Sequence, residues 1–438
     1  MRASESQEHT DTALTEIAWL STSNRAQVYH SLMHHINVGS LRRCFEKLDG
    51  KKALGADKIS KDTYGEELQT NLDDLISRMK RMAYRPQPVR QVLIPKEGKP
   101  GATRPLGISN FEDKLVQKRI QEILESIYDP IFLDCSYGFR PRKGCHDAIK
   151  ALTEHLFKEE VEVVIDVDLA NFFGTIDHQV LKDMLSMKIK DSKFLRYISR
   201  MFKAGILAEG ELIVSDEGVP QGSCCSPALS NIVAHYVIDM WIEETVKPLT
   251  VGPIKMFRYA DDLVVCCRFE KDAIKVREAL GKRLAKYKLK LNEEKTKMVS
   301  FSKKKSSQGI KQDAFNFLGF TFYLGKSLKG RVIPKLKTNG KRFRSKLKRV
   351  NDWARQIRNK APLSSIWKIF CAKLRGHVQY YGVSFNSKSV SNFIKQARRI
   401  IFKWLNRRSQ RKSFDWEKFE LFTRKSPLPV VKVHHKLF

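Results

Sequence analysis

The chain has 438 residues, too many for one ordinary hydrophobic core, so we expect two or three domains. Hydrophobic residues make up 42% of the chain, which excludes an intrinsically disordered protein. Its 81 basic against 48 acidic residues give a net charge of +33, which indicates a nucleic acid, an anionic membrane surface or an acidic protein as partner. No apolar run reaches the roughly 18 residues that cross a bilayer. The first residues also lack a signal-peptide pattern, so we expect a cytoplasmic protein that binds nucleic acid and no membrane.

The first third of the chain alternates helical and strand patterns. Residues 1 to about 30 are polar and predict either a loose arm or an added helix. Helical spacing of apolar residues runs from Leu41 to Met82 and again from Leu115 to Ile127. A strand pattern from Val89 to Ile94 lies between them and leads into a turn rich in glycine and proline.

The middle of the chain carries the clearest strand patterns. The β-branched run Val161 to Val167 predicts a buried strand, and Phe257 to Phe269 predicts two strands joined by a turn. Ser226-Pro227 suits the start of a helix, with serine as its cap and proline in its first turn. A helix over Ala273 to Leu289 and a short hairpin over Phe315 to Tyr323 complete this α/β region.

The last quarter of the chain is basic. Between Arg331 and Lys360 there are twelve basic residues and one acid. Apolar residues then follow helical spacing over 366–378 and 390–404. We therefore divide the chain into an N-terminal extension, an α/β domain and a basic helical module, at residues 1–40, 41–330 and 331–438.

The eight cysteines include no Cys-x-x-Cys pair, so a zinc ribbon or a cysteine-rich nuclease module is not expected. The adjacent pairs Cys224–Cys225 and Cys266–Cys267 lie in or beside apolar runs. We therefore predict reduced core thiols in a reducing compartment.

Two of the predicted buried strands carry acids. One includes Asp166 and Asp168, and the turn of the other pair holds Asp261 and Asp262. An unpaired buried carboxylate is costly, so these acids need salt bridges or bound cations. A salt bridge explains any single acid, Asp166 in particular, but explains the whole set poorly. Nucleotidyl transfer needs two hard cations about 3.5–4 Å apart on oxygen ligands, which such a set would supply.

Five motifs occur in the order found in reverse transcriptases. Tyr259-Ala260-Asp261-Asp262 resembles that family's YxDD box. The other four, in chain order, are Asp168-Leu169-Ala170-Asn171-Phe172-Phe173, Gly218-Val219-Pro220-Gln221-Gly222 with Ser226-Pro227, Leu291-Asn292-Glu293-Glu294-Lys295-Thr296, and Phe317-Leu318-Gly319-Phe320. One box alone is weak evidence, but five in order are specific.

Over about residues 40 to 430 the chain resembles the bacterial group II intron-encoded reverse transcriptase and maturase family. The segments that carry this are Ile94-Pro95-Lys96, Arg104-Pro105-Leu106-Gly107-Ile108, Ser136-Tyr137-Gly138-Phe139-Arg140-Pro141, Gln379-Tyr380-Tyr381-Gly382 and Trp404-Leu405-Asn406-Arg407-Arg408-Ser409. The resemblance implies an α/β (α+β) right-hand polymerase with fingers, a palm of antiparallel sheet packed on helices, and a helical thumb or maturase domain. It implies dNTPs as substrates, and RNA template, intron RNA and a DNA primer or target DNA as partners.

The resemblance also assigns roles in catalysis. Asp168 and Asp261 would hold two Mg²⁺ ions, for which Mn²⁺ can substitute, with Asp262 contributing and the carbonyl of Leu169 assisting. Lys295 would protonate the leaving pyrophosphate, or it is an ion-paired surface lysine.

Further residues are assigned to substrates, each with a plainer alternative. Lys96 and Arg104 would grip the triphosphate, or they are ordinary loop charges. Phe173 would block a 2′-hydroxyl, or it belongs to the core with Phe172. Gln221 and Gly222 would let the backbone approach the nucleotide, or they form a plain turn. Contacts to nucleic acid are assigned to Arg140, Lys346, Lys348 and Arg349, or the last three belong to a solvated helix face.

Two departures from the family pattern narrow the expectation. Gly174 stands where relatives often carry an acid, and the zinc motifs of their HNH nuclease module are absent. We therefore expect no cleavage of a second target strand. Three functions stay open: a polymerase that aids splicing of its parent intron, a non-catalytic RNA-binding maturase, and a host-recruited reverse transcriptase in phage defence. The intact Asp168, Asp261 and Asp262 favour the polymerase, and the sequence predicts no oligomeric state.

Overall fold

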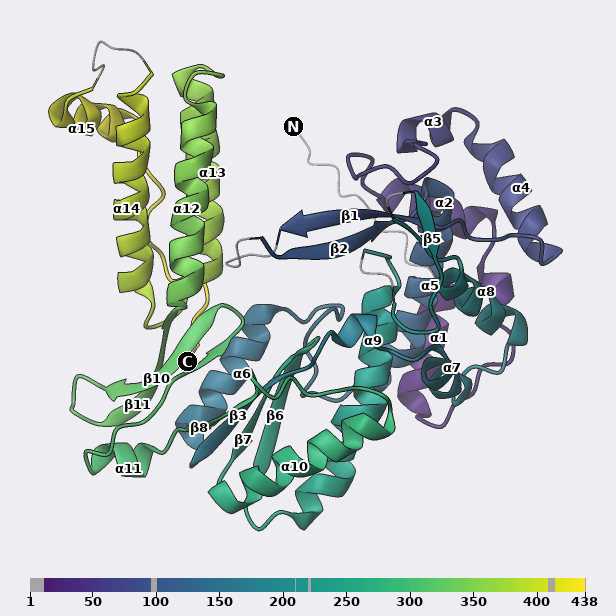
Figure 1. Cartoon of the computed structure of the whole chain (residues 1–438), viewed down its shortest axis with the longest axis horizontal. Helices are drawn as coiled ribbons and strands as arrows, with labels where there is room; N and C mark the ends of the chain where they lie inside the picture. Colours follow the sequence, from purple (N-terminus) through teal and green to yellow (C-terminus); the bar gives the residue numbers. More distant parts are fainter. Residues whose placement is uncertain (1–11, 96–100, 209, 220–221, 409–413, 438) are drawn as a thin grey trace.

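The computed structural model describes residues 12–95, 101–208, 210–219, 222–408 and 414–437. Figure 1 shows three parts: a helical part with a long hairpin, a central sheet with helices, and an upright group of helices near the C-terminus. We call these parts the fingers, the palm and the thumb.

The fingers are built around the buried helix α5 (Phe111–Tyr128), against which α1 and α2 pack. Their other helices are α1 (Thr12–Ser23), α2 (Val38–Lys47), α3 (Lys61–Glu66), α4 (Leu68–Lys80), α7 (His178–Ser186) and α8 (Ser192–Lys203). Their sheet has the order β2-β1-β4-β5, with β1 (Val89–Pro95), β2 (Thr103–Ile108), β4 (Ile206–Ala208) and β5 (Glu211–Ile213). The predicted helices and the predicted strand of this part are confirmed, and part of the N-terminal extension is helix α1.

The palm is a four-stranded antiparallel sheet of order β6-β7-β3-β8. Its strands are β3 (Val163–Asp168), β6 (Ile254–Tyr259), β7 (Asp262–Cys267) and β8 (Lys297–Ser300). Side chains alternate between the faces of a strand. Ile165 and Val167 therefore join the core beneath α9 (Ser226–Ala234) and α10 (Glu270–Lys286), whereas Val164 joins the core beneath α6 (Cys145–Lys158). Two π-helical segments, η4 (His235–Asp239) and η5 (Trp241–Val246), continue α9.

A second, three-stranded sheet of order β11-β10-β9 covers the α6 side of the palm. Its strands are β9 (Phe315–Phe317), β10 (Phe320–Lys326) and β11 (Val332–Thr338). Seven cross-strand pairs join β10 to β11, so a domain boundary between residues 330 and 331 would cut this hairpin at its turn. The basic tract thus begins with a strand that the sequence did not predict, and it continues as a helix.

The thumb consists of α12 (Gly340–Ile357), α13 (Leu363–Tyr381), α14 (Ser387–Leu405) and α15 (Trp416–Lys425). Its aromatic core includes Trp367, Phe370, Phe393 and Phe419. The two helices predicted from apolar spacing are confirmed as α13 and α14.

The α/β (α+β) class and the fingers, palm and thumb arrangement are confirmed. One local prediction is wrong: Cys225 precedes the first residue of α9, so Ser226 lies inside the helix and is not its cap. All eight cysteines are free, as predicted. Within the described ranges, we find no helix with the length and apolar character that a membrane crossing requires.

Candidate active site

The hairpin β6–β7 places two acids at one end of the palm sheet. Tyr259 pairs with Asp262, which leaves Ala260 and Asp261 as a two-residue turn. Ala260 has φ +57°, in the left-handed region that suits such tight turns. On the next strand Asp168 lies directly opposite Asp262. Opposite residues of an antiparallel pair share a face, with Cβ atoms about 4.5–5.5 Å apart. Two motifs almost a hundred residues apart therefore meet.

Burial, and after it the negative charge of neighbouring acids, raises the pKa of both acids of the hairpin, Asp261 and Asp262. Asp262 is exposed at the end of the sheet, yet burial of its carboxyl by surrounding protein, together with Asp261 and Asp168, raises its pKa to about 6. Burial also raises the pKa of Asp261; Asp168 adds to this, whereas Arg104 acts in the opposite direction. Such a set of acids holds excess negative charge, which a bound cation would relieve.

Asp166 lies one pleat behind Asp168 on the same face of β3. Burial, then Asp262 and Asp168, raise its pKa to about 6, against an opposing effect of Lys297. Lys297 lies directly opposite Asp166 on β8. Among the described residues, Lys297 and Asp166 form no ion pair, so the salt bridge considered for Asp166 is not found, and Lys297 acts on it only as a neighbouring positive charge.

The segment that contains Lys295 wraps around Asp168. The Asn292 N–H donates to the carbonyl of Asp168 over 2.8 Å, and Leu169 forms a backbone bridge with Leu291. The Lys295 Nζ lies 2.9 and 3.1 Å from the two carboxylate oxygens of Asp168. Lys295 is thus ion-paired to the candidate metal ligand itself, which brings its ammonium group into the site.

The residues of this site fit a hard divalent cation in their chemistry. Carboxylate oxygens are the ligands that Mg²⁺ prefers, and Asp168 and Asp262 supply them from adjacent strands and Asp261 from the turn beside them. Within the described part of the chain, no three acidic, histidine or cysteine side chains already converge closely enough to hold a metal ion. A cation on Asp168 would have to replace the ammonium of Lys295. Since both partners of that ion pair are about half exposed, the exchange costs little.

A buried arginine holds the acidic turn from behind. Arg258 is fully buried and forms a bidentate ion pair with Asp239 at 2.7 and 2.6 Å. Its Nη1 also donates to the Asn231 side chain over 2.9 Å and to the Ala260 carbonyl over 3.2 Å. A Cβ on Gly138 would lie 2.4 Å from the Ala260 nitrogen, so only glycine fits against the turn. The sequence predictions missed this network; its signal was an arginine inside the apolar run of β6.

The residues assigned to the nucleotide lie around the same acids. Arg104 extends from β2 and acts electrostatically on Asp261. Phe172 is buried, whereas Phe173 is only partly buried and contacts it edge-on at a centroid distance of 5.7 Å. The core member of the pair is therefore Phe172. Lys96, one of the two triphosphate candidates, falls outside the described residues.

Gly222 makes a close approach, but to the protein itself. It has φ +110°, and a Cβ there would lie 2.4 Å from the carbonyl oxygen of Gly107 on β2. This contact joins the motif loop to the fingers hairpin, so glycine is needed at this position for a structural reason. Gln221, its neighbour in the motif, is not among the described residues.

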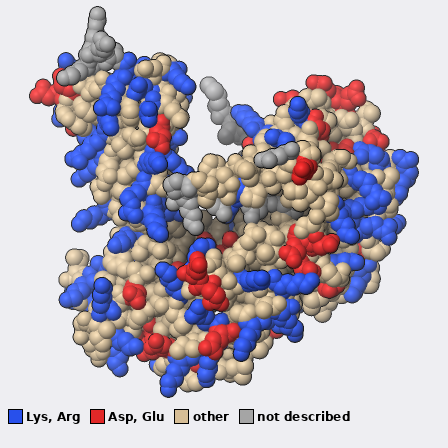
Figure 2. All heavy atoms as spheres, in the orientation of Figure 1, with Lys and Arg blue, Asp and Glu red and all other residues tan. Residues whose placement is uncertain are grey.

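The four nucleic-acid candidates divide into two groups. Arg140 has a side chain only 7% exposed and an ion pair to Asp129, and it donates to backbone carbonyls as well. Its assignment to nucleic acid is therefore corrected: it braces its own loop. Lys348 and Arg349 are exposed on α12, whereas Lys346 lies over the ring of Tyr381 at 4.6 Å. Figure 2 shows lysine and arginine over much of the thumb surface in view.

Residues 94–322, more than half of the chain, match the family model described as reverse transcriptase (RNA-dependent DNA polymerase). The chain belongs to the reverse transcriptase family. The matched region runs from β1 to β10 and includes every acid of the candidate site.

The similar curated proteins include several that introns encode. The chain is 36% identical over 191 residues to the group II intron-encoded protein LtrA of Lactococcus lactis subsp. cremoris, covering 44% of this chain and 31% of that protein. It is 34% identical over 218 residues to an uncharacterized 91 kDa protein in the cob intron of Schizosaccharomyces pombe, covering 50% and 26%. It is 29% identical over 301 residues to the protein YkfC of Escherichia coli, covering 62% and 76%. The chain thus spans less than a third of the first two relatives. The resemblance to group II intron-encoded proteins is confirmed.

Proposed function

We propose that this chain is an RNA-directed DNA polymerase that extends a DNA 3′ end on an RNA template with dNTPs, by two-metal nucleotidyl transfer. One observation carries the proposal: Asp168 and Asp262 lie opposite each other on one face of the palm, with Asp261 in the adjoining turn. In this proposal Asp168 and Asp261 hold both ions, Asp262 contributes charge and the Leu169 carbonyl assists. When bound, Mg²⁺ or Mn²⁺ would activate the 3′-hydroxyl and stabilise the departing pyrophosphate.

The remaining residues act on the substrates. Arg104 balances negative charge beside Asp261, which suits a triphosphate that enters from the fingers. Lys96 belongs to the same proposal by resemblance alone. Lys295 contacts Asp168 in this structure, and in the proposal a cation that displaces its ammonium group leaves it beside the site to give a proton to the pyrophosphate. Phe173, Gln221 and Gly222 complete the proposed nucleotide site.

We also propose that the thumb binds intron RNA and aids splicing of the parent intron. The support is the twelve basic residues between Arg331 and Lys360, many of them on α12, and the likeness to intron-encoded proteins. Folded RNA is recognised by shape and phosphate over such broad basic surfaces. The free cysteines suit the reducing cytoplasm in which we place this activity.

Primer extension with the purified chain on an RNA template and DNA primer tests the polymerase. Extension should require Mg²⁺ or Mn²⁺, and Asp261→Asn should abolish it, because asparagine keeps the shape but loses the charge that balances the cations. The matched control is Asp313→Asn at an exposed position, which should extend normally. Normal extension by an Asp261→Asn protein with an unchanged circular dichroism spectrum would overturn the mechanism. Absence of extension in the unmodified chain would leave the non-catalytic maturase.

A further inference from the structure

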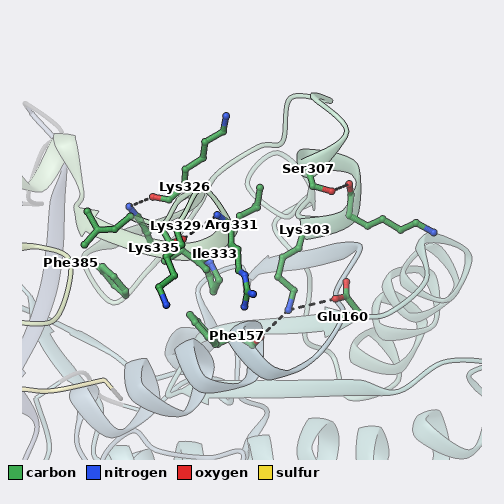
Figure 3. A pocket seen from close by; sticks show the side chains of 15 residues that line it. Phe157, Glu160, Lys303, Ser307, Lys326, Lys329, Arg331, Ile333, Lys335 and Phe385 are labelled. Carbon is green, nitrogen blue, oxygen red and sulfur yellow. Dashed lines mark hydrogen bonds and ion pairs between the residues drawn. The ribbon is translucent and has the colours of Figure 1, made fainter.

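A basic pocket lies between the end of α6, helix α11 (Lys303–Ser307), the β10–β11 hairpin and Phe385. Its volume is about 1080 Å³, and none of the candidate catalytic or nucleotide residues lines it. Figure 3 shows Arg331 and Lys335 extending from the hairpin towards Phe157 on α6. The pocket therefore joins segments from the palm and from the base of the thumb.

The charge of the pocket is almost entirely positive. Six basic residues line it against one acid, Glu160. They are Lys303, Lys304, Lys326, Lys329, Arg331 and Lys335. A pocket with this imbalance attracts anions and repels cations.

Two of the six basic groups are held by the protein's own backbone. The Lys303 Nζ donates to the carbonyls of Phe157 and Glu159 at 2.9 and 2.8 Å, which caps the end of α6. The Lys335 Nζ donates to the Lys326 carbonyl at 2.6 Å. The other four side chains are exposed and form no ion pair with any residue that the structure describes. They are available to an external anion.

The pocket also exposes aromatic rings, which a site for a simple anion does not need. Phe157 and Phe385 are 42% and 41% exposed. The backbone of Phe385 has φ +68°, a left-handed conformation that is costly for a bulky residue. The next residue, Asn386, is fully buried and hydrogen-bonded to Thr338 and to the Tyr381 carbonyl, which fixes this loop. The structure thus holds an exposed ring in place at a conformational cost.

The hairpin that carries most of these cations is well ordered. Its strands pair in register from Phe320–Thr338 to Lys326–Val332. In its turn the Ser327 N–H donates to the Arg331 carbonyl over 2.8 Å, and the Arg331 N–H donates to the Ser327 hydroxyl over 3.1 Å. A ligand would therefore meet cations on a framework that is already formed, at a small cost in ordering.

We propose that this pocket binds single-stranded nucleic acid, with the four available cations on phosphates and the rings of Phe157 and Phe385 on unstacked bases. Aromatic faces combined with cations are the means by which proteins bind unpaired nucleotides. A duplex keeps its bases stacked and offers no face to these rings, and an acidic peptide has no need of them. The site is separate from the proposed polymerase centre, so it adds a second contact for nucleic acid on the palm and thumb.

The test uses the full chain with its polymerase cleft saturated by an unlabelled RNA–DNA hybrid. The labelled strands can then bind only at sites outside that cleft. Binding of fluorescent eight-nucleotide RNA and DNA single strands is measured by anisotropy at several salt concentrations. The pocket variant is Lys304→Gln/Lys326→Gln/Lys329→Gln, which leaves the basic tract from Arg331 to Lys360 intact. The control variant is Lys271→Gln/Lys275→Gln/Lys282→Gln, which removes equal charge from exposed positions of α10.

The pocket variant should lower the slope of log K against log salt by about 0.7 for each phosphate that it no longer neutralises, whereas the control should keep the slope. Phe385→Ala and Phe157→Ala should each weaken binding roughly tenfold, since they remove stacking faces. Binding of either strand that is weakened in the pocket variant supports the proposal. The strand with the higher affinity, RNA or DNA, is then taken as the natural ligand. Equal slopes in both triple variants, or equal binding of a duplex competitor, would overturn it. Primer extension should be normal in every pocket variant, so failure here is distinguishable from failure of the polymerase proposal.

Discussion

The palm and the thumb use charge in opposite ways. In the palm, a few carboxylates sit at the end of a sheet whose two faces are packed against apolar layers, and each has a defined neighbour. In the thumb, positive charge is spread along the outside of long helices; of the 18 residues of α12, only Val350 and Ala354 are buried. In the palm, burial and then the neighbouring acids raise the pKa of Asp262, whereas exposed cations on a helix are largely screened by water and salt.

The palm and the thumb should therefore tolerate substitutions to different degrees. A catalytic carboxylate works only at a fixed position, so residues that never touch substrate, such as Arg258, become essential through the turn that they hold. A surface that binds phosphate works through the sum of many contacts, so the removal of one lysine changes little. Substitutions in the palm should therefore have large individual effects, and those in the thumb should have graded, additive ones.

The largest effect is expected at Arg258. Arg258→Met leaves the buried Asp239 without its partner, which should destabilise the protein by about 3–5 kcal/mol. Adding Asp239→Leu removes the stranded charge and should recover most of that stability in urea unfolding. Primer extension by the double variant should still be roughly a hundredfold slower, because the Ala260 carbonyl no longer has its donor. If the double variant recovers primer extension as fully as it recovers stability, the Arg258 network serves folding alone.

Next comes the thumb surface, where the effect should be graded. Replacing Lys346, Lys348 and Arg349 with glutamine should lower the slope of log K against log salt for RNA by about 0.7–0.9 for each phosphate left without its cation. Since Lys346 lies over Tyr381, we expect it to contribute less than the exposed Lys348. A filter-binding salt titration of the triple and single variants measures this. An unchanged slope in the triple variant would mean that these residues of α12 contact only solvent and no RNA phosphate.

On catalysis, a smaller effect than that of the Arg258 network is expected from the two phenylalanines that follow Asp168. If the partly buried ring of Phe173 blocks a 2′-hydroxyl, as proposed, Phe173→Ala should raise the use of ribonucleotides relative to deoxyribonucleotides by roughly tenfold. Phe172→Ala should mainly lower stability, by about 3–5 kcal/mol, because that ring is in the core. Single-nucleotide incorporation with matched dNTP and NTP measures the ratio. An unaltered ratio in Phe173→Ala would move sugar selection to another residue.

The smallest effect concerns acid stability of the thumb. His377 is buried against Phe393, neither ring nitrogen has a partner among the described residues, and burial lowers its pKa to about 3. The unfolded histidine takes up a proton near pH 6.5, whereas the folded one does not. The free energy of unfolding should therefore decrease as the pH is lowered past 6.5, by about 1.4 kcal/mol at pH 5.5. His377→Phe should remove this part of the pH dependence. Urea unfolding followed by tryptophan fluorescence reports on it, since four of the six tryptophans lie in α12–α15. An equal pH dependence in the variant would contradict the prediction.

The sequence predicted much of this fold because its strongest patterns are local. Apolar spacing predicted α5, α10, α13 and α14, and β-branched runs predicted β3 and β7. Strand β11 was missed because Pro334 and two lysines interrupt its pattern. The structure tolerates that proline because β11 is an edge strand of its sheet.

The candidate site was predictable in its acids but not in its supports. Motif order was enough to bring Asp168 together with Asp261 and Asp262 in one expected site, but the direct cross-strand pairing of Asp168 with Asp262 came from the structure. The ion pair of Lys295 with Asp168 and the network of Arg258 depend on how distant segments pack, which spacing does not encode. Arg140 was misassigned for the same reason: its partner Asp129 closes a loop that only the folded chain forms.

If the palm acids carry the chemistry and the basic surface binds RNA, as proposed, DNA synthesis and RNA binding should be separable by substitution. The direct measurement is DNA synthesis and intron RNA binding in one protein, Asp261→Ala/Asp262→Ala, compared with the unmodified chain. Synthesis should disappear. The affinity for RNA should be unchanged, because the removal of two acids hardly alters the attraction of a chain with charge +33. A folded double variant that fails to bind RNA as well as to synthesise DNA would contradict the account.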